Sequence, residues 1–431
     1  MAPPKFYQQI HFLPLLIICT LSLLTTFTAL AENWLNHGGD LNNRRYASKE
    51  TKISPKTASK LSLKWEFYAG KDKSATPSIF NGTLYFPSWN GEIYAVNAFD
   101  SSLVWKKDIR NLTVLSQRPS LVANVNWTVS RATPTIVVDD DHDDMICSLL
   151  ECMDLLLLLL SFYVGTSSLE EELSIEECCR FRGSVCKLDV ESGEILWKTF
   201  ILPGNFGKTG AYAGAAIWGS SPSIDIHRNH VYIATGNLYS VPPHIEECQE
   251  SENNQTVPTH SDRCVEPDNH SNSILALDLD SGKIKWYHQL GGYDFWFFTC
   301  NNLSTPGCPP GPNPDADFGE APMMLSIQVK GIKKDNVAAV QKSGFAWALD
   351  RNNGSFLWST NFTLKPSNKT STSGGWVAMD ARNGKILWSI ADPSNALAFG
   401  PVTLANGVLF AGSTHGKGPI YAMNAKTGKV L

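Results

Sequence analysis

The sequence predicts an all-β fold, a β-propeller built from four-stranded blades. Three observations support this prediction: a repeated two-strand unit that ends in Trp, an abundance of Gly, Pro and Trp, and a scarcity of long amphipathic helical stretches. Such a sequence favours many short strands joined by tight turns. The chain has 431 residues, 43% of them hydrophobic, and can therefore bury a large core as one repeat domain.

Each repeat unit combines the same parts. A strand with alternating side chains, such as residues 91–97, is expected to be half-buried. An Asp or Asn followed by Gly makes a tight turn in which Gly takes a positive φ. The next strand ends in Trp, whose indole can cover a neighbouring sheet. Five units end in Trp and a sixth copy lacks it: Trp105, Trp197, Trp286, Trp358, Trp388, and residues 420–431.

A second hairpin precedes each unit, as in residues 75–86. Two hairpins make a four-stranded blade, and blades that stack radially protect one another's edges. The alternative is a set of unrelated hairpins that end in Trp by coincidence. The recurrence of turn, Gly and Trp in the same order favours the propeller.

The repeats are irregular in three places. Trp358 and Trp388 lie 30 residues apart, whereas a blade needs about 40–45 residues, which indicates a deletion near residue 360. Residues 139–162 form an atypical segment, whose acidic start we interpret as a solvated loop rather than a cation site. The last copy stops before its Trp. We therefore expect an incomplete ring, which reflects either a real shortened variant or a faulty gene model.

The N-terminal residues 1–31 are predicted to be a signal peptide. Lys5 precedes the apolar stretch 12–24, and residues 29–31 form a small-x-small cleavage site. A membrane anchor is the alternative, but a proline and several hydroxyl residues within the stretch argue against a spanning helix. The propeller domain is then residues 32–431, with no membrane span in the mature chain.

Composition indicates an extracellular protein. The net charge is -5 and no basic block is present, which argues against nucleic acid and anionic membrane surfaces as partners. Nine Asn-x-Ser/Thr triplets suit an N-glycosylated, secreted chain, although some of them must arise by chance. The triplets start at Asn81, Asn111, Asn126, Asn254, Asn269, Asn302, Asn353, Asn361 and Asn368.

Nine cysteines follow the predicted signal peptide, so at least one thiol is free. Two pairs bracket polar loops and are plausible local disulfides in an oxidising compartment: Cys248 with Cys264, and Cys300 with Cys308. The adjacent Cys178 and Cys179 either close an eight-membered disulfide ring or pair elsewhere. The chain has no Cys-x-x-Cys-His motif for covalent haem.

The repeat resembles the PQQ-type repeat of quinoprotein alcohol dehydrogenases. Residues 34–40, Trp-Leu-Asn-His-Gly-Gly-Asp, and residues 43–46, Asn-Arg-Arg-Tyr, resemble the start of those enzymes. In particular, the chain is similar to the plant polyvinyl-alcohol dehydrogenase-like proteins over nearly all of its length after the signal. The resemblance implies a quinoprotein-type, eight-bladed propeller with pyrroloquinoline quinone (PQQ) at its axis, located in the cell wall or apoplast.

The resemblance also implies a Ca²⁺ site. Glu170 occupies the position of the calcium-ligand Glu, and Ser167 that of a cofactor contact, although Glu170 could instead be a strand-end residue in water. Asn237, in a Thr-Gly-Asn at a strand end, matches the residue that supplies an amide oxygen. Carboxylate and amide oxygens are suitable ligands for this hard cation. Trp218 matches the floor beneath the quinone, the alternative being a core or docking Trp.

Three further roles follow from the same resemblance. Asp317 and Asp294 are the candidate catalytic bases that take the alcohol proton, with Asp317 preferred; loop carboxylates that cap turns are the alternative. Phe297 stands where the bacterial alcohol dehydrogenases have another Asp. Lys342 is expected to contact the cofactor, because a cation there stabilises the reduced, anionic quinone. Arg131 is a second cofactor-contact candidate.

The expected function is that of an oxidoreductase. It would oxidise hydroxyl groups of a small or polymeric alcohol or polyol with PQQ and Ca²⁺, and pass the electrons to a separate acceptor. The alternative is a non-catalytic propeller, a binding or scaffold module that has lost the cofactor, because a fold alone does not imply an activity.

Overall fold

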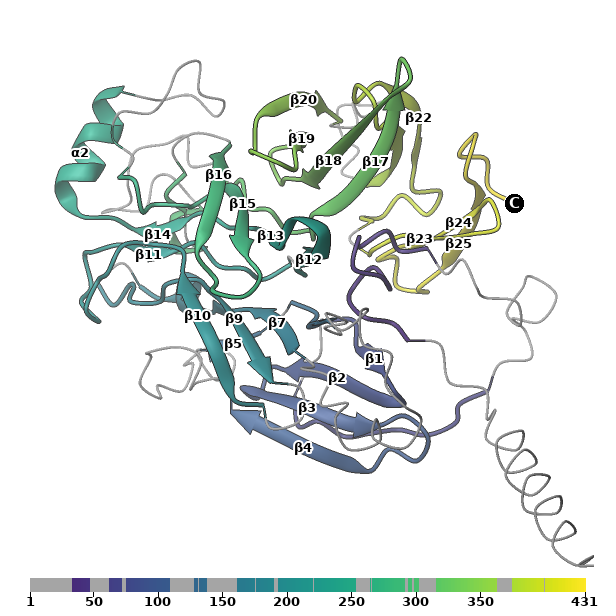
Figure 1. Ribbon diagram of the computed structural model, residues 1–431, viewed down its shortest axis with the longest axis horizontal. Helices are drawn as coiled ribbons and strands as arrows, with labels where there is room; N and C mark the ends of the chain where they lie inside the picture. The colour runs from purple at the N-terminus through teal and green to yellow at the C-terminus, as the bar shows by residue number, and fades with distance from the viewer. Residues whose placement is uncertain are drawn as a thin grey trace, which may run out of the picture.

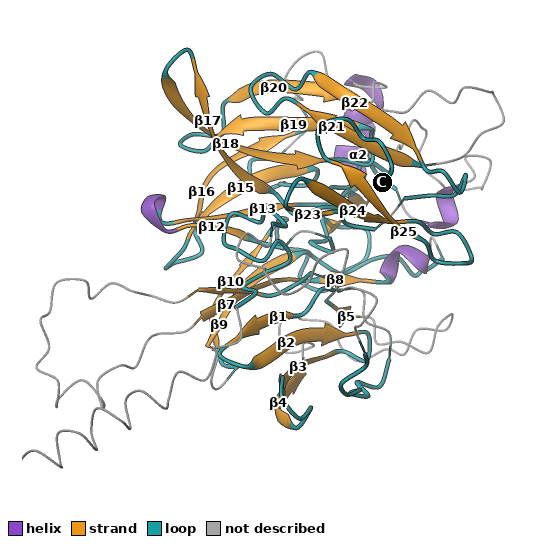
Figure 2. Ribbon diagram, turned by 90° about the vertical axis from the view of Figure 1, so that its right-hand side faces the viewer, coloured by secondary structure: helices purple, strands orange, loops and turns teal. Residues whose placement is uncertain are grey.

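The computed structural model describes sixteen stretches of the chain: 33–46, 62–71, 75–108, 128–130, 132–137, 161–174, 176–189, 193–219, 221–252, 264, 266–290, 294–296, 298–301, 315–362, 374–398 and 400–431. The regular structure of these residues is nearly all strand (Figure 2). Its helices are α2 (Pro243–Glu252) and the 3-10 turns η3 (Glu170–Glu172), η4 (Ile226–Arg228) and η5 (Phe298–Asn301). The predicted signal peptide lies outside the described residues.

Four sheets have four antiparallel strands each, arranged around a common centre (Figure 1). The first and second sheets are β1 (Ser78–Phe80), β2 (Thr83–Ser88), β3 (Glu92–Asn97) and β4 (Leu103–Asp108), then β6 (Thr135–Val137), β7 (Ser161–Gly165), β9 (Ser184–Asp189) and β10 (Ile195–Phe200). The third and fourth are β12 (Ser223–Asp225), β13 (His230–Ala234), β15 (Ser273–Asp278) and β16 (Ile284–Gln289), then β17 (Met323–Val329), β18 (Ile332–Val340), β19 (Phe345–Asp350) and β20 (Phe356–Asn361).

Smaller sheets complete the strand inventory of the described residues. A two-stranded sheet contains β21 (Gly375–Met379) and β22 (Ile386–Ala391), and a three-stranded sheet contains β23 (Thr403–Ala405), β24 (Val408–Gly412) and β25 (Ile420–Asn424). Two short pairs are β5 (Thr128–Val129) with β8 (Ser167–Ser168), and β11 (Ala213–Gly214) with β14 (Leu238–Ser240). The all-β propeller predicted from the repeat is confirmed. The predicted deletion near 360 and the atypical segment 139–162, of which only the last two residues are described, remain predictions.

The core lies between neighbouring sheets rather than inside any one of them. Ile93 of the first sheet packs with Phe162 of the second in one buried cluster. Tyr232 of the third sheet packs with Leu349 of the fourth in another. The third strand of each four-stranded sheet is almost wholly buried, and the fourth strand is half-exposed at the outside. Each sheet is therefore stable only against its neighbours, as expected for a propeller.

The repeat's Trp docks on the turn of the following sheet. The Trp197 indole N–H donates to the Leu279 carbonyl at 3.2 Å, and a Cβ placed on Gly282 would lie 2.6 Å from the Trp197 ring. The same contact recurs at three further pairs: Trp286 over Gly354, Trp358 over Gly384, and Trp388 over Gly428. The Trp and the turn Gly of the signature are thus two halves of one contact between sheets.

A further docking Trp was not recognised in the sequence. The Trp65 indole N–H donates to the Ala98 carbonyl at 2.9 Å, in the turn between β3 and β4. This turn has no Gly; Ser101 takes its left-handed conformation, with φ of 62°. Trp65 was missed because the repeat signature was recognised by a turn Gly and a preceding hairpin, and neither accompanies it.

Residues 33–46 run past the first strand of five sheets. Trp34 forms a pair of backbone hydrogen bonds with Ile79 of β1, at 2.7 and 2.8 Å. Backbone hydrogen bonds of 2.8–3.0 Å then link this segment to β6, β12, β17 and β23: Leu35 to Ile136, Leu41 to Ile224, Asn42 to Met324, and Arg45 to Leu404. The N-terminal segment therefore lies beside the C-terminal sheet and ties it to the others (Figure 1).

Several smaller expectations can be compared with the structure. The Cys248–Cys264 disulfide is confirmed, and Cys178 pairs with Cys179. Cys300 is also disulfide-bonded, but Cys308 lies outside the described residues. The Asn269 side chain is 2% exposed, so its Asn-x-Ser triplet cannot carry a glycan in the folded protein. None of the helices in the described part is long and apolar enough to cross a membrane.

The Trp-to-Gly contact predicts a difference between two glycine substitutions. Gly282 and Gly210 both have a φ of +69°, but no heavy atom lies within 4 Å of a Cβ at Gly210. Gly210→Ala should cost about 1–2 kcal/mol of unfolding free energy for the strained φ alone. Gly282→Ala should cost about 1–3 kcal/mol more, because its Cβ meets Trp197. Urea unfolding measures both; equal losses would show that the contact does not hold the sheets.

Candidate functional site

The candidate site is centred on the Asp317 carboxylate, which accepts hydrogen bonds from three segments of the chain. The backbone N–H of Asn237 donates to Oδ1 at 2.6 Å. The Trp218 indole N–H and the Lys342 ammonium donate to Oδ2 at 2.9 and 3.1 Å. Asp317 is 4% exposed, so these donors replace water around its two oxygens. Four of the predicted site residues are thereby brought together.

Two glycines allow this close approach. A Cβ on Gly236 would lie 2.5 Å from Asp317 Oδ1. A Cβ on Gly319 would lie 2.9 Å from the Trp218 ring. The Thr-Gly-Asn and Asp-Phe-Gly motifs therefore have a steric reason for their glycines, since a side chain at either position would push the carboxylate or the indole away.

Lys342 lies between two carboxylates and two indoles. Its ammonium donates to Asp315 Oδ1 at 2.7 Å as well as to Asp317. It also lies 5.1 and 5.9 Å from the ring centres of Trp218 and Trp296, within cation–π range. Burial lowers the pKa of Lys342, but the charges of Asp317 and Asp315 outweigh burial and raise it overall. Lys342 is thus a fixed positive charge beside an indole face.

Asp315 is a site residue that the sequence reasoning did not select. Burial, followed by the charge of Asp317, raises its pKa to about 6 despite the nearby Lys342. The Glu171 carboxylate contributes to the same rise. The Asp-x-Asp spacing was the available signal, because residues two apart share a side of an extended chain. Asp315 and Asp317 therefore share one lysine.

Asp294, the second candidate base, contacts the backbone of the loop that carries Asp315 and Asp317. It is 2% exposed, and its carboxylate accepts from the backbone N–H groups of Asp315 and Ala316 at 3.1 and 2.6 Å. The Asn272 amide donates to it at 3.1 Å. Burial raises its pKa to about 7. The geometry makes Asp294 the support of the Asp315–Asp317 loop.

Asn237 offers an oriented amide. Its Nδ2 donates to the carbonyls of Leu238 and Trp296, at 2.8 and 2.7 Å. Both amide hydrogens are therefore used, which fixes the direction of the Oδ1 acceptor. The Asn237 amide oxygen is thereby held in one direction.

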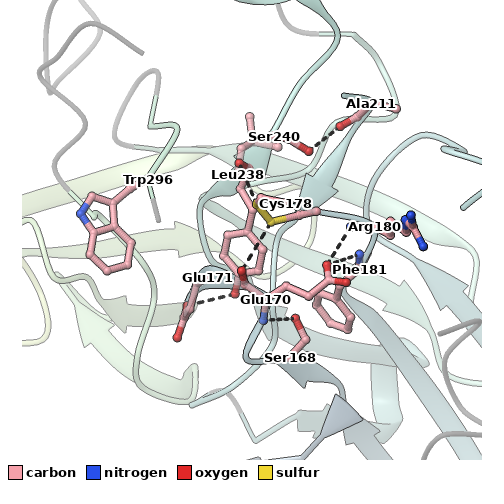
Figure 3. The surroundings of a disulfide bond; sticks show 12 residues. Ser168, Glu170, Glu171, Cys178, Arg180, Phe181, Ala211, Leu238, Ser240 and Trp296 are labelled. Atoms are coloured by element: carbon pink, nitrogen blue, oxygen red, sulfur yellow. Dashed lines mark hydrogen bonds between the residues drawn. A yellow bond between two sulfur atoms is a disulfide. The ribbon is translucent and has the colours of Figure 1, made fainter. Parts of the chain in front are cut away.

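Glu170 is held by the backbone of Arg180 and Phe181 (Figure 3). It is 7% exposed, and its Oε2 accepts from the Arg180 and Phe181 backbone N–H groups, both at 2.7 Å. The Phe181 carbonyl accepts from Gly214, and the next residue, Ala215, donates to the Asn237 carbonyl. A continuous hydrogen-bonded path therefore connects Glu170 to Asn237 and on to Asp317.

The remaining expectations concern Ser167, Arg131 and the metal. Ser167 is fully buried in β8 and pairs with Val129. Arg131 lies outside the described residues. In the described stretches, no group of three or more His, Cys, Asp and Glu side chains is arranged to hold a metal ion. A cation bound by Glu170 and Asn237 would need further oxygen ligands, because Ca²⁺ takes about six to eight.

The burial of Asp294 predicts a pH-dependent stability difference. Its pKa rises from 3.8 to about 7 on folding, so the native state holds the proton more tightly than the unfolded state. Its contribution to the unfolding free energy therefore falls as pH rises from about 4 to about 7. Asp294→Asn removes this titration, so the stability of the variant relative to wild type should increase over that range by up to about 4 kcal/mol.

Urea unfolding at about pH 4.5, 6 and 7.5 measures this difference. Other titrating groups are common to both proteins and cancel in the comparison. A difference that stays constant across the range would contradict the assignment of a raised pKa to Asp294.

Comparison with known proteins finds one matching family profile and several similar sequences. The family profile described as PQQ, glucose/ethanol/alcohol dehydrogenase, beta-propeller domain, matches residues 164–373. The polyvinylalcohol dehydrogenase of Pseudomonas sp is 25% identical over 360 residues, which cover 76% of this chain and 50% of that protein. The polyvinylalcohol dehydrogenase of Sphingopyxis sp. (strain 113P3) is 25% identical over 368 residues, covering 78% and 51%.

Solved structures share the propeller fold. The crystal structure of quinohemoprotein alcohol dehydrogenase from Comamonas testosteroni superposes with a TM-score of 0.60 at 16% identity, covering 95% of this chain and 74% of that one. The chain spans about half the length of the polyvinylalcohol dehydrogenases it matches. The repeat signature, the matched family profile and the superposed propeller agree: the chain is similar to the PQQ alcohol dehydrogenases, and it has their propeller fold.

Proposed function

We propose that the protein is a PQQ- and Ca²⁺-dependent dehydrogenase that oxidises hydroxyl groups of an alcohol or polyol. The observation that carries the proposal is the convergence of Lys342, Trp218 and Asn237 on Asp317. A base, a cation and a flat aromatic surface within one hydrogen-bonded group are the parts that hydride removal from an alcohol requires.

The residues present fit this cofactor. Trp218 offers an indole face that could stack on a flat ring system, and Lys342 lies 5.1 Å from the centre of that ring. Asn237 and Glu170 would supply oxygen ligands to Ca²⁺. Ser167 and Arg131 are proposed as further cofactor contacts. When bound, PQQ accepts the hydride equivalent, two electrons, from the alcohol carbon.

The chain's own residues would then perform the proton chemistry. Asp317 is proposed to accept the hydroxyl proton, with Asp315 as the neighbouring carboxylate on the same lysine. Lys342 would stabilise negative charge that develops on an adjacent oxygen. Asp294 would hold the loop that carries both aspartates, through the amides of Asp315 and Ala316. The electrons would leave to a separate acceptor.

Further parts of the proposal rest on the sequence. The signal peptide and the sequons support a secreted, glycosylated protein of the cell wall or apoplast. The names of the matched relatives support an alcohol substrate, of small or polymeric form. The alternative of a non-catalytic binding module predicts no turnover, and the following experiment separates the two.

Lys342→Met should abolish most of the activity. Purified protein is mixed with PQQ and Ca²⁺, and dye-linked oxidation of simple alcohols is followed together with cofactor absorbance. Loss of one charge-stabilising donor should lower kcat by about 10²–10³-fold. The matched control is Lys334→Met, an exposed lysine on β18 of the same sheet, which should leave kcat unchanged.

Two results would decide against the proposal. Wild-type protein that binds no PQQ at saturating Ca²⁺ would support the non-catalytic alternative. Equal rates for the Lys342→Met and Lys334→Met variants would remove Lys342 from the chemistry.

A further inference from the structure

The disulfide between Cys178 and Cys179 lies next to the groups that orient Glu170. Arg180 and Phe181 directly follow the disulfide, and their consecutive N–H groups both donate to one carboxylate oxygen, Glu170 Oε2, at 2.7 Å (Figure 3). Two successive amides can meet one oxygen only if the backbone before and between them is bent. The disulfide closes the backbone immediately before the first of these two amides.

The two sulfur atoms also contact the elements on either side. Cys179 Sγ lies 3.6 Å from the carbonyl oxygen of Glu170, in η3. Cys178 Sγ lies 3.9 Å from the carbonyl oxygen of Tyr239, in β14, two residues after Asn237. The disulfide therefore lies between η3, which contains Glu170, and β14, which begins directly after Asn237.

The disulfide pair is packed as part of the core. Cys178 and Cys179 are 8% and 0% exposed, in a buried cluster that includes Phe181 and Tyr239 and against which Trp218 packs. A covalent bond between adjacent residues closes a ring of eight atoms, which removes most of the rotational freedom of this turn. Opening the ring gives that freedom back to the amides of Arg180 and Phe181 while leaving the sequence around them intact.

We infer that the Cys178–Cys179 disulfide is a positioning device for cation binding: it fixes the Arg180 and Phe181 amides that aim the Glu170 carboxylate. The inference rests on the proposed function, in which Glu170 is a Ca²⁺ ligand. Groups that orient a metal ligand commonly contribute 10–100-fold to metal affinity. The disulfide would act only through Glu170, and this restriction makes the inference testable.

The test is a double-mutant cycle on Ca²⁺ affinity. Ca²⁺ is titrated calorimetrically into the full chain in the presence of excess PQQ. The Cys178→Ser/Cys179→Ser variant opens the ring by exchanging two atoms and should weaken Ca²⁺ binding by about 10–100-fold. Glu170→Gln should weaken it as well, and adding the two serines to Glu170→Gln should cause no further loss. The matched control, Cys248→Ser/Cys264→Ser, removes another disulfide and should leave Ca²⁺ affinity unchanged.

Each outcome has one meaning. Ca²⁺ affinity within twofold of wild type in the ring-opened variant, with a loss in Glu170→Gln, overturns this inference alone. Additive losses also overturn it, because they show that the disulfide acts by a route other than Glu170. Unchanged affinity in Glu170→Gln overturns the Glu170 ligand and this inference together. Absence of Ca²⁺ and PQQ binding in the wild type overturns the proposed function itself.

If the double-serine variant fails to fold by circular dichroism, Cys178→Ser and Cys179→Ser are titrated separately. Each opens the ring with one atom exchanged, and both should weaken Ca²⁺ binding to the same extent. Two folded single variants with wild-type affinity would overturn the inference.

Discussion

The contact between a docking Trp and the turn of the next sheet, with a glycine beneath the indole at four of these turns, is the constraint on which the propeller depends. At four of these turns the indole lies directly over a glycine and donates to a carbonyl of the same turn, as at Trp197 over Gly282. Since the core lies between sheets, this contact fixes how neighbouring sheets meet and therefore the shape of the core. A single sheet could not bury its own apolar faces, so the repeated contact is what converts hairpins into a domain.

The same arrangement creates the candidate site. Glu170, Asn237 and Lys342 each follow the second strand of its own sheet, after β7, β13 and β18. Trp218 and Asp317 each precede a first strand, β12 and β17, which is antiparallel to that second strand. These positions lie at one end of the sheets, so radial packing brings residues from distant repeats together. Figure 1 shows the sheets converging on this common centre.

The sequence was informative where a signal repeats. Spacing and turn chemistry predicted the strands and the docking Trp residues, but Trp65 escaped because Ser101 replaces the turn glycine. Resemblance brought Asp317, Trp218, Asn237 and Lys342 together as candidates. It named both Asp317 and Asp294 as candidate bases, with Asp317 preferred, but it could not show how each carboxylate is held, which depends on the amides that face it. The sequence also could not predict the surroundings of the Cys178–Cys179 disulfide, because its contacts with Glu170 and Tyr239 depend on the folding of the chain.

The charges of the described site indicate that the proposed cation would also change the pKa of nearby carboxyl groups. The negative charge of Asp317 contributes to the raised pKa of both Asp294 and Asp315, and that of Glu171 contributes at Asp315. Lys342 provides the positive charge that pairs with Asp315 and Asp317. Burial and mutual repulsion therefore raise the pKa of Asp294 and of Asp315. A divalent cation held by Glu170 and Asn237 would lower the pKa of carboxyl groups near it, since a bound ion is the largest local charge. Cation binding and the readiness of an aspartate to accept a proton would then be coupled, and the group that orients Glu170 would influence both.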